Sequence, residues 1–565
     1  MTRNGLGIAA AAIMWAAPVM AAQERAYDIP EQDLGKALQV FAAISGREIV
    51  AASDVIEGKR AGAVRGALTA EAALARLLAG TGLRFELVEG AFVIRPDDAG
   101  RPNEGAVDPV GITVTGSRIR GAAIASPRIT RQLADLQAQG LATLTDAART
   151  IPQNFGGGQN PTVGVGVPAT SGVNVGGGSS LNLRGLGSDA TLTLLNGRRL
   201  SYSASRQSVD LSAIPTGIVD RIEIVADGAS AIYGSDAVAG VANIVLRRDM
   251  EGLVTTARLG GSTDGGNDQR TLAATTGTRW EGGGGILAYE YGFNAPIVGS
   301  QRSYTRNTGA RGLDLLPEIE RHNAALSVHH RLGPVTASLD ALYNHRRSLL
   351  VYAANPAGDR NNLYIQVPSR NESFLVAPSL ALEVGHGWRA ELSGSYGEDE
   401  GQYNTNVFNG ATQLVALEGC YCNELHSVEL SADGPLVELP AGSARLAVGL
   451  GLRDVGFVSV RGAGNPQNID AHQRSKYAFG EVVVPLLARA GSGILLQASA
   501  AARYERYPDL GEIVTPKVGL VFAPTADLDL KASWGRSFRA PTLLQRYEIS
   551  YALLYPAAAL GGNGF

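Results

Sequence analysis

Two neighbouring stretches decide the fold: LNLRGLGSDATLTLLNGRRL at residues 181–200 and VDLSAIPTGIVDRIEIVADGASAIYGSDAVAGVANIVLRRD at residues 209–249. No other part of the chain is as dense in short runs of strand-forming residues separated by Gly, Asp and Asn. Such runs bounded by turn residues are typical of β-strands. We therefore expect a compact sheet-containing domain here, and we interpret the flanking sequence in relation to it.

A dinucleotide-binding site is the main alternative for this stretch. Residues 185–190 fit the pattern G-x-G-x-x-A, and Asp210 follows at about the distance that a ribose-binding acid requires. That motif must open a helix whose N-terminus holds the pyrophosphate. The next residues, TLTLLNGRRL, alternate with the period of a strand and run into an Asn-Gly turn. We therefore expect no dinucleotide site.

Composition excludes several classes of protein. The 565 residues suffice for several domains. The 49 Lys and Arg residues balance 53 Asp and Glu residues, for a net charge of −4, so a nucleic-acid partner is not expected. With 71 Gly and only 18% charged residues, the chain is typical of a turn-rich β protein. Nucleophile-elbow and zincin motifs are absent from the sequence, and we expect neither an enzyme nor a bound cofactor.

The two cysteines, Cys420 and Cys422, flank a single tyrosine. In an oxidising compartment they could form a small loop disulfide, and in a reducing one they would be free thiols. A metal site is the weaker interpretation, because the seven His residues show no ligand spacing beside this pair.

The N-terminus reads as an export signal. Residues 1–22 combine Arg3, a short apolar core and the small-residue cleavage site Val19-Met20-Ala21. No later run of about 20 apolar residues exists, which excludes a helical membrane protein. The mature chain is then either soluble outside the cytoplasm or inserted as a β-barrel.

Residues 26–96 predict a small α+β domain of order β-α-β-β-α-β-β. Leu34, Ala37, Leu38 and Phe41 share one helix face, and Thr69 is a good N-cap for a second helix. Residues 97–111 have the composition of a linker. The β-branched run that begins residues 112–118, ITVTGSR, is suited to adding a strand to a partner's sheet edge.

These segments carry a resemblance to a known family. The stretch with LRG at 183–185 and RIE at 221–223 resembles the plug domain of TonB-dependent outer-membrane receptors, which places the plug at residues 126–250. YDIP, LTAEAALARLLAGTGL and FVIRP resemble the short N-terminal domain shared by secretins and transducer-type receptors. The resemblance implies an outer-membrane protein of a Gram-negative bacterium whose N-terminal domain lies in the periplasm and contacts an anti-sigma regulator.

The resemblance also implies roles for particular residues. Ile112, Thr113, Val114 and Thr115 would form a TonB box that binds TonB by strand addition. Arg184, Arg221 and Glu223 would form a plug–barrel ion lock, through ion pairs to the barrel wall and to each other. The alternative is that these three side chains are solvated between plug and barrel, where each contributes little.

Residues 253–565 predict a partial transmembrane β-barrel in contact with outer-membrane lipid. Segments of about 10 residues alternate apolar with polar side chains and are separated by turns or polar loops. Between residues 496 and 505, for example, Leu, Ala and Tyr occupy one face and Gln, Ser, Arg and Glu the other. A soluble sandwich shows the same alternation, but the signal peptide, the plug and the rhythm of loops and turns favour the barrel.

We count about 13 such segments, the last at residues 528–534, whereas barrels of this family have more strands. We therefore expect a fragment or a truncated gene product, with an open sheet edge that would prevent stable insertion as a transporter.

Three functions follow as expectations. They are active import of a scarce ligand driven by TonB, signal transduction through residues 26–96, and a truncated remnant with neither activity. The family's commonest ligand is a ferric siderophore, and a carbohydrate is the second candidate. Residues 352–371 and 398–422 are expected as ligand-facing loops, with Arg360 and Arg370 as their main cations.

Overall fold

The computed structural model describes most of the chain. The described residues are 25–45, 49–50, 59–88, 91–96, 115–157, 176–205, 207–462, 464–489, 494–525 and 528–549. The chain forms two compact units, Met1–Ala106 and Val107–Phe565, which are described separately. The predicted signal peptide at 1–22 and the predicted linker at 97–111 lie outside the described residues.

The first unit is the predicted α+β domain. Its elements are β1 (Arg25–Ile29), β2 (Gln32–Asp33), α1 (Leu34–Ser45), β3 (Ile49–Val50), β4 (Arg60–Ala61), β5 (Val64–Leu68), α3 (Ala70–Leu78), β6 (Leu83–Val88) and β7 (Ala91–Pro96). β1 pairs with β5, β2 pairs with β4, and β7 lies between β3 and β6. The predicted face of α1 is buried in the core of this unit, and Thr69 caps α3 by accepting a hydrogen bond from the Ala72 amide at 3.2 Å.

The second unit begins with a domain built on a five-stranded sheet. Its elements are β8 (Arg128–Gln132), α4 (Leu133–Ala138), α5 (Leu144–Arg149), β9 (Thr191–Leu195), β10 (Arg198–Arg199), β11 (Val219–Val225), α6 (Ser230–Tyr233) and β12 (Gly240–Leu246). The strand order is β10-β9-β12-β11-β8, and only the β12–β9 pair is parallel. The strand β9 follows the glycines of the 185–190 motif after one short turn of 3-10 helix, which excludes a pyrophosphate-binding helix there.

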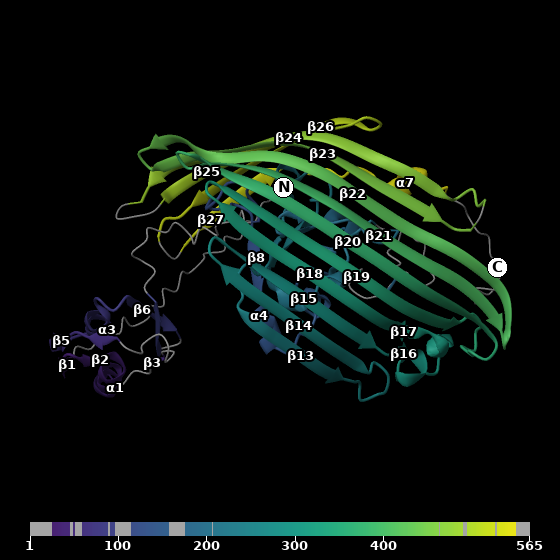
Figure 1. The fold of residues 1–565 in the computed structure, drawn as a ribbon, viewed down its shortest axis with the longest axis horizontal. Coiled ribbons are helices and arrows are strands. Elements are labelled where there is room, and N and C mark those ends of the chain that lie inside the picture. Colours follow the sequence, from purple (N-terminus) through teal and green to yellow (C-terminus); the bar gives the residue numbers. More distant parts are fainter. Residues whose placement is uncertain are drawn as a thin grey trace, which may run out of the picture. The chain divides into compact units, whose positions relative to one another are not determined.

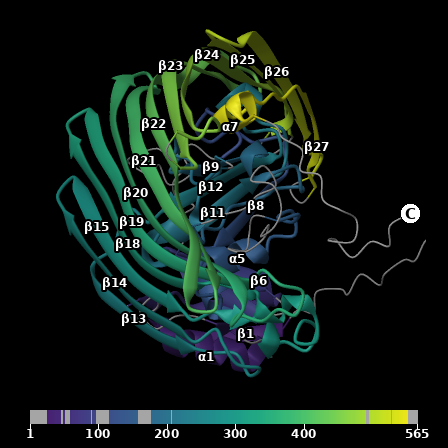
Figure 2. The same cartoon turned by 90° about the vertical axis from the view of Figure 1, so that its right-hand side faces the viewer.

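Residues 252–535 form a large antiparallel sheet of 13 strands, which confirms the predicted count. The strands are β13 (Gly252–Gly260), β14 (Gln269–Trp280), β15 (Gly283–Asn294), β18 (Glu318–Leu332), β19 (Val335–Ala353), β20 (Leu363–Gly385), β21 (Trp388–Asn409), β22 (Thr412–Leu439), β23 (Gly442–Val460), β24 (Ile469–Ala488), β25 (Ile494–Tyr507), β26 (Gly511–Phe522) and β27 (Leu530–Gly535). The sheet curves strongly, and β9, β11 and β12 lie on its concave side (Figures 1 and 2). The concave face therefore packs on the smaller domain, as in a barrel wall around a plug.

The two ends of the sheet differ in the length of their connections. Two-residue turns join β14 to β15, β18 to β19, β20 to β21 and β22 to β23. At the other end, the connection from β15 to β18 contains β16 (Ile297–Val298), β17 (Asp314–Leu316) and two turns of 3-10 helix. In outer-membrane barrels the short turns face the periplasm and the long connections face outward.

On every strand from β18 to β26, the outward side chains of the convex face change from apolar to charged or histidine at a similar height. Toward the short turns the outward side chains are mainly apolar, and toward the long connections they become charged or histidine. The first such residues on successive strands are His322, His345, Glu372, Glu398, His426, Asp454, Lys476, Arg506 and Glu512. Several outward aromatic rings lie just below this level, namely Tyr343, Phe374, Tyr396 and Tyr504. An apolar band bordered by aromatic rings is the expected lipid-facing surface.

The prediction of loops at residues 352–371 and 398–422 is wrong. Only 354–362 and the tight turn at 410–411 connect strands there, and the remaining residues extend β19 to β22. The polar side chains that suggested loops lie on strands that continue beyond the apolar band. No described helix is long and apolar enough to cross a membrane.

Candidate ligand cavity and plug interface

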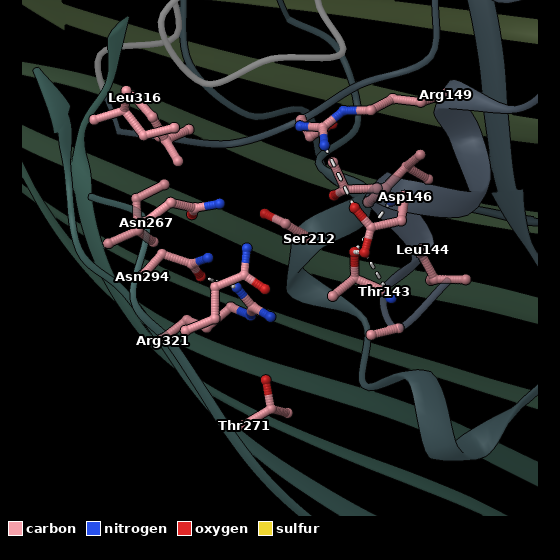
Figure 3. A pocket seen from close by; sticks show the side chains of 18 of the residues that line it. Thr143, Leu144, Asp146, Arg149, Ser212, Asn267, Thr271, Asn294, Leu316 and Arg321 are labelled. Atoms are coloured by element: carbon pink, nitrogen blue, oxygen red, sulfur yellow. Dashed lines mark hydrogen bonds and ion pairs between the residues drawn. The ribbon is translucent and has the colours of Figure 1, made fainter. Parts of the chain in front are cut away.

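A cavity of about 750 Å³ lies between the smaller domain and the sheet, at the end with long connections. Thr143 to Asp146 and Arg149 line one side, and they belong to helix α5 and its capping residue (Figure 3). Ser212 adds a hydroxyl from a turn of 3-10 helix. The opposite side comes from β13, β14, β15 and β18 and from the connection that contains β16 and β17. This volume is in the range of sites for small organic ligands.

Helix α5 is fixed by a capping box that also shapes the cavity wall. The Thr143 hydroxyl accepts from the Asp146 amide at 3.1 Å, and the Asp146 carboxylate accepts from the Thr143 amide at 3.2 Å. Arg149 lies 3.4 Å from the same carboxylate. A six-residue helix would be marginal alone, and these bonds together with its buried leucine and alanines hold it in place.

Four arginines and three carboxylates line the cavity, and most of these charges are paired. Arg321 lies 3.5 Å from Glu290, and Asp314 lies 2.5 Å from Arg360, which is outside the lining. Burial raises the pKa of the Asp314 carboxyl, and Arg360 opposes this rise only in part.

Two of the lining arginines have no carboxylate partner. Arg302 donates to the backbone oxygens of Asp264 and Gly265 at 3.3 and 2.9 Å. The Arg258 side chain has no hydrogen bond or ion pair in the part of the chain that the structure describes, and it is half-buried. An anionic group entering the cavity would therefore meet a guanidinium with free donors.

Neutral polar groups complete the wall. Gln269, Thr271 and Asn294 present amides and a hydroxyl from the strands, and Asn267 adds an amide from the connection between β13 and β14; Asn267, Thr271 and Asn294 are labelled in Figure 3. The arrangement of a few charged and amide groups on a largely preformed surface is suited to binding a polar anion.

Buried or half-buried ion pairs join the smaller domain to the sheet. The pair between Asp210 and Arg346 has side chains only 5% and 1% exposed. Four further pairs reach the sheet, namely Arg118–Glu429 at 3.1 Å, Arg120–Asp433 at 3.0 Å, Asp227–Lys517 at 2.9 Å and Arg198–Glu391. Asp189 pairs at 2.7 Å with Arg539, which follows the last strand of the sheet. These pairs come from loops and edges of the smaller domain, where side chains can reach the wall.

The three residues expected to form the ion lock are placed differently. Arg184 donates to the backbone oxygens of Val238 and Ala239 at 2.7 and 2.9 Å. Arg221 and Glu223 do meet each other at 2.9 Å, as expected, but Arg221's other partner is Asp220. In the described residues, all of these bonds stay inside the smaller domain, and β11, which carries Arg221 and Glu223, is an inner strand between β12 and β8.

Sequence reasoning did not assign Asp210 to this interface. Its only sequence signal was its spacing from the glycine motif, which pointed to a nucleotide. In the structure its carboxylate accepts from the Ser179 and Ser212 amides at 2.9 Å each and pairs with Arg346. Burial would raise its pKa, but Arg346 and these amides hold the pKa below its ordinary value.

Of the four residues expected to bind TonB, Ile112, Thr113 and Val114 lie outside the described residues. Thr115 is 1% exposed. Its amide and hydroxyl both donate to Oε2 of Glu223, at 3.1 and 2.6 Å, and its hydroxyl accepts from the Asn243 amide group at 3.1 Å. Glu223 thus connects the segment that precedes the domain to strand β11.

Cys420 and Cys422 are joined by a disulfide with a Cα–Cα distance of 5.9 Å. It lies within strand β22 and not in a loop, because that strand continues to a turn at 410–411. The intervening Tyr421 points inward and stacks on Tyr403 with ring centroids 5.2 Å apart. Within the described residues, no group of three or more His, Cys, Asp or Glu side chains could hold a metal ion.

Comparison with protein families gives three matches along the chain. Residues 48–97 match the secretin and TonB N-terminus short domain, and residues 122–241 match the TonB-dependent receptor plug domain. Residues 255–564, more than half of the chain, match the TonB dependent receptor-like β-barrel. The chain belongs to the TonB-dependent receptors. It is therefore an outer-membrane protein with a plug and an N-terminal short domain.

A vitamin B12 transporter is among the similar proteins. The receptor is 25% identical over 390 residues to the vitamin B12 transporter BtuB of Vibrio cholerae, a match covering 66% of this chain and 55% of the transporter. The receptor chain thus spans about half the length of this curated relative.

Solved structures share the fold at low identity. The ferripyoverdine receptor of Pseudomonas aeruginosa matches with a TM-score of 0.53 and 15% identity, over 92% of this chain and 71% of that one. The ferric enterobactin receptor PfeA of Pseudomonas aeruginosa matches with a TM-score of 0.58 and 16% identity, over 75% and 64%.

Proposed function

We propose that this receptor captures an anionic ligand, most simply a ferric siderophore, in the cavity between plug and barrel and imports it across the outer membrane. The cavity carries this proposal: it has the volume for such a ligand, four arginines against three carboxylates, and Arg258 with unused donors. Ferric siderophores are often anionic, and a charge-assisted hydrogen bond to an otherwise unpaired guanidinium favours them. The solved relatives that bind ferric siderophores add support at the level of fold.

The coupling step is the second part of the proposal. TonB would add a strand to the residues around Ile112 to Thr115 and pull on them. Because Thr115 is bonded to Glu223, a pull on this segment acts directly on strand β11 of the plug. No nucleotide is required at the receptor.

A binding experiment tests the ligand. The purified chain is titrated with an anionic ferric siderophore, vitamin B12 and a neutral oligosaccharide, with Arg258→Ala as the test variant and Arg279→Ala as the control. Arg279 is exposed on β14 outside the cavity. The proposal expects binding of the ferric siderophore, weakened roughly 10- to 100-fold by Arg258→Ala alone. Preference for vitamin B12 or the oligosaccharide, or equal effects of the two variants, would contradict it.

Signalling is a second function, favoured by the match of residues 48–97 to the short domain. This domain has its own core and belongs to a separate compact unit, so it can be removed without opening the plug. We expect deletion of residues 26–96 to preserve uptake and to abolish the transcriptional response to ligand through an anti-sigma partner. Loss of uptake on deletion would contradict a purely signalling role for the domain.

A further inference from the structure

A second, smaller cavity lies between the plug and the barrel wall, next to Asp210. Its volume is about 30 Å³, which is enough for about two particles of the size of a water molecule. The plug side includes Ser201 and Ser203, from the loop that follows β10. Within the described part of the chain, the lining contains two carboxylates, those of Asp210 and Asp399, and no Lys or Arg.

The wall side of this cavity is a row of polar residues across three neighbouring strands. Asp399 on β21 lies directly opposite Ser373 on β20, and Ser373 lies directly opposite Asn344 on β19. Asp399 is 3% exposed and Asn344 is 1% exposed. Because side chains at one register position leave the same face of a sheet, Asp399 and Asn344 approach the cavity from either side of Ser373.

Hydrogen bonds fix the orientation of the Asn344 amide. The Nδ2 of Asn323 donates to the backbone oxygen of Ser212 at 2.9 Å, which makes the Asn323 Oδ1 an acceptor on its other side. The Nδ2 of Asn344 donates to that oxygen at 2.6 Å. The Oδ1 of Asn344 therefore points away from Asn323, and it is buried with no donor in the part of the chain that the structure describes.

The Asp399 carboxylate is also only partly satisfied. Its Oδ2 accepts from the Asn371 amide group at 3.1 Å, whereas its Oδ1 is buried and has no donor among the described residues. The charge of Arg346 is already matched by Asp210. Asp399 is thus a buried carboxylate without a counter-charge of its own, which is a costly arrangement in a protein interior.

We propose that Asp399 and Asn344 bind a monovalent alkali cation, Na⁺, in this cavity. Hard cations take oxygen ligands, and the cavity offers carboxylate, amide and hydroxyl oxygens. One unbalanced carboxylate matches a single positive charge, whereas Ca²⁺ takes about six to eight oxygens, commonly from several carboxylates. The cation joins two strands of the wall to the plug loop at Ser201 and Ser203. Among the described residues, none lines both this cavity and the ligand cavity, so the site is separate from ligand capture.

Cation-dependent stability of the purified full chain tests the site. The urea midpoint and the proteolytic resistance of the plug are measured in NaCl and in N-methyl-D-glucamine chloride at equal ionic strength. The test variant Asp399→Asn keeps the shape of the side chain and removes its charge. The control Asp340→Asn does the same to another buried carboxylate of the wall, whose two oxygens accept from Asn196 and Ser327.

We expect Na⁺ to raise the urea midpoint of the parent to a plateau, because a ligand of the folded state alone stabilises that state. The half-saturating Na⁺ concentration should rise roughly 10-fold or more in Asp399→Asn and stay within about twofold in the control. Without Na⁺, Asp399→Asn should be at least as stable as the parent, since it removes an unpaired buried charge. Equal Na⁺ responses of the parent and Asp399→Asn, or equal effects of the two salts on the parent, would overturn the proposal.

A second measurement does not depend on how the variants fold. Crystals of the parent are soaked in a Tl⁺ salt, because Tl⁺ replaces alkali cations and scatters anomalously. An anomalous peak between Asp399 and Asn344 is the expected result. Density there without an anomalous signal would show that water fills the cavity, and it would overturn the assignment to a cation.

Discussion

Asp210 of the plug and Arg346 of strand β19 form an ion pair from which water is almost excluded. The Arg346 guanidinium also donates to the Gly176 backbone oxygen at 2.5 Å and to the Ser212 hydroxyl at 2.9 Å. Each charge thus has several partners, and one side chain of the wall binds two separate segments of the plug, at Gly176 and at Asp210 with Ser212. Among the described residues, it is the most buried ion pair between the two domains.

Removing one member of this pair should release the plug. Arg346→Ala leaves the Asp210 carboxylate buried without its counter-charge, which costs about 3–5 kcal/mol. We expect faster proteolysis of the plug and a lower midpoint in urea unfolding. The control Arg370→Ala breaks an exposed pair on β20 and should leave both unchanged. The double variant Arg346→Met with Asp210→Leu should recover much of the lost stability, because it leaves no buried charge unpaired. If this double variant is destabilised as much as Arg346→Ala, an electrostatic origin of the loss is contradicted.

Acid should weaken the plug's connections in a defined window. Burial acts to raise the pKa of Asp210, Glu223 and Asp236, but hydrogen bonds and arginines hold each pKa below its ordinary value, to about 2 for Asp236. A carboxyl whose pKa is lower in the folded state than in the unfolded state stabilises the fold at any pH above its unfolded-state pKa of about 4. This stabilisation is lost as the pH falls through the folded-state pKa. We expect proteolytic resistance of the plug to be constant above about pH 5 and to fall between about pH 4 and 2. Resistance that falls already near neutral pH would contradict this.

The bond between Thr115 and Glu223 should limit access to the coupling segment. Glu223→Ala removes the acceptor of two hydrogen bonds, and a bond to a charged group contributes about 1.5–3 kcal/mol. We expect protease cleavage near residues 112–115 to rise roughly 10- to 100-fold. Thr115→Val keeps the hydrogen bond from the backbone amide to Glu223 and loses only the one from the hydroxyl, so it should give a smaller rise in cleavage. Glu251→Ala, at an exposed site, is the control, and an equal rise there would exclude a specific restraint.

The disulfide should matter little for overall stability. Cys420 and Cys422 close a loop of only three residues, for which the chain-entropy gain is about 1.5 kcal/mol. The double variant to Ser should therefore unfold at nearly the same urea concentration as the parent, with or without reductant. A large loss would show that the disulfide has a second effect, through the orientation of Tyr421.

The features that depend on local sequence pattern, such as helix faces, helix caps and strand alternation, were predicted from the sequence. The helix faces around Leu34 and Leu74, the Thr69 cap and the alternation of residues 496–505 all follow from periodicity and capping chemistry, and the structure has them. The number of strands was predicted from the same two-residue alternation of apolar and polar side chains. Polar residues at 398–422 indicated a loop, because a strand that extends beyond a membrane carries polar side chains on both faces.

The interface between plug and wall was not predictable in the same way. Asp210 and Arg346 are 136 residues apart, and no local pattern connects them. Arg221 and Glu223 have the alternation of a strand, but only the sheet order shows that β11 is internal to the plug. The cavity likewise combines α5 with strands more than a hundred residues later, so its residues could not be grouped from sequence.

Uptake by living cells tests the central proposal most directly. Cells producing the chain are supplied with a radioactive anionic ferric siderophore, and the parent is compared with Arg258→Ala and with a variant in which residues 112–114 are replaced by glycine. We predict full accumulation only in the parent, with the glycine variant still binding the ligand at the surface and Arg258→Ala binding it roughly 10- to 100-fold more weakly. Equal accumulation in all three strains, or binding that ignores Arg258, would contradict the account.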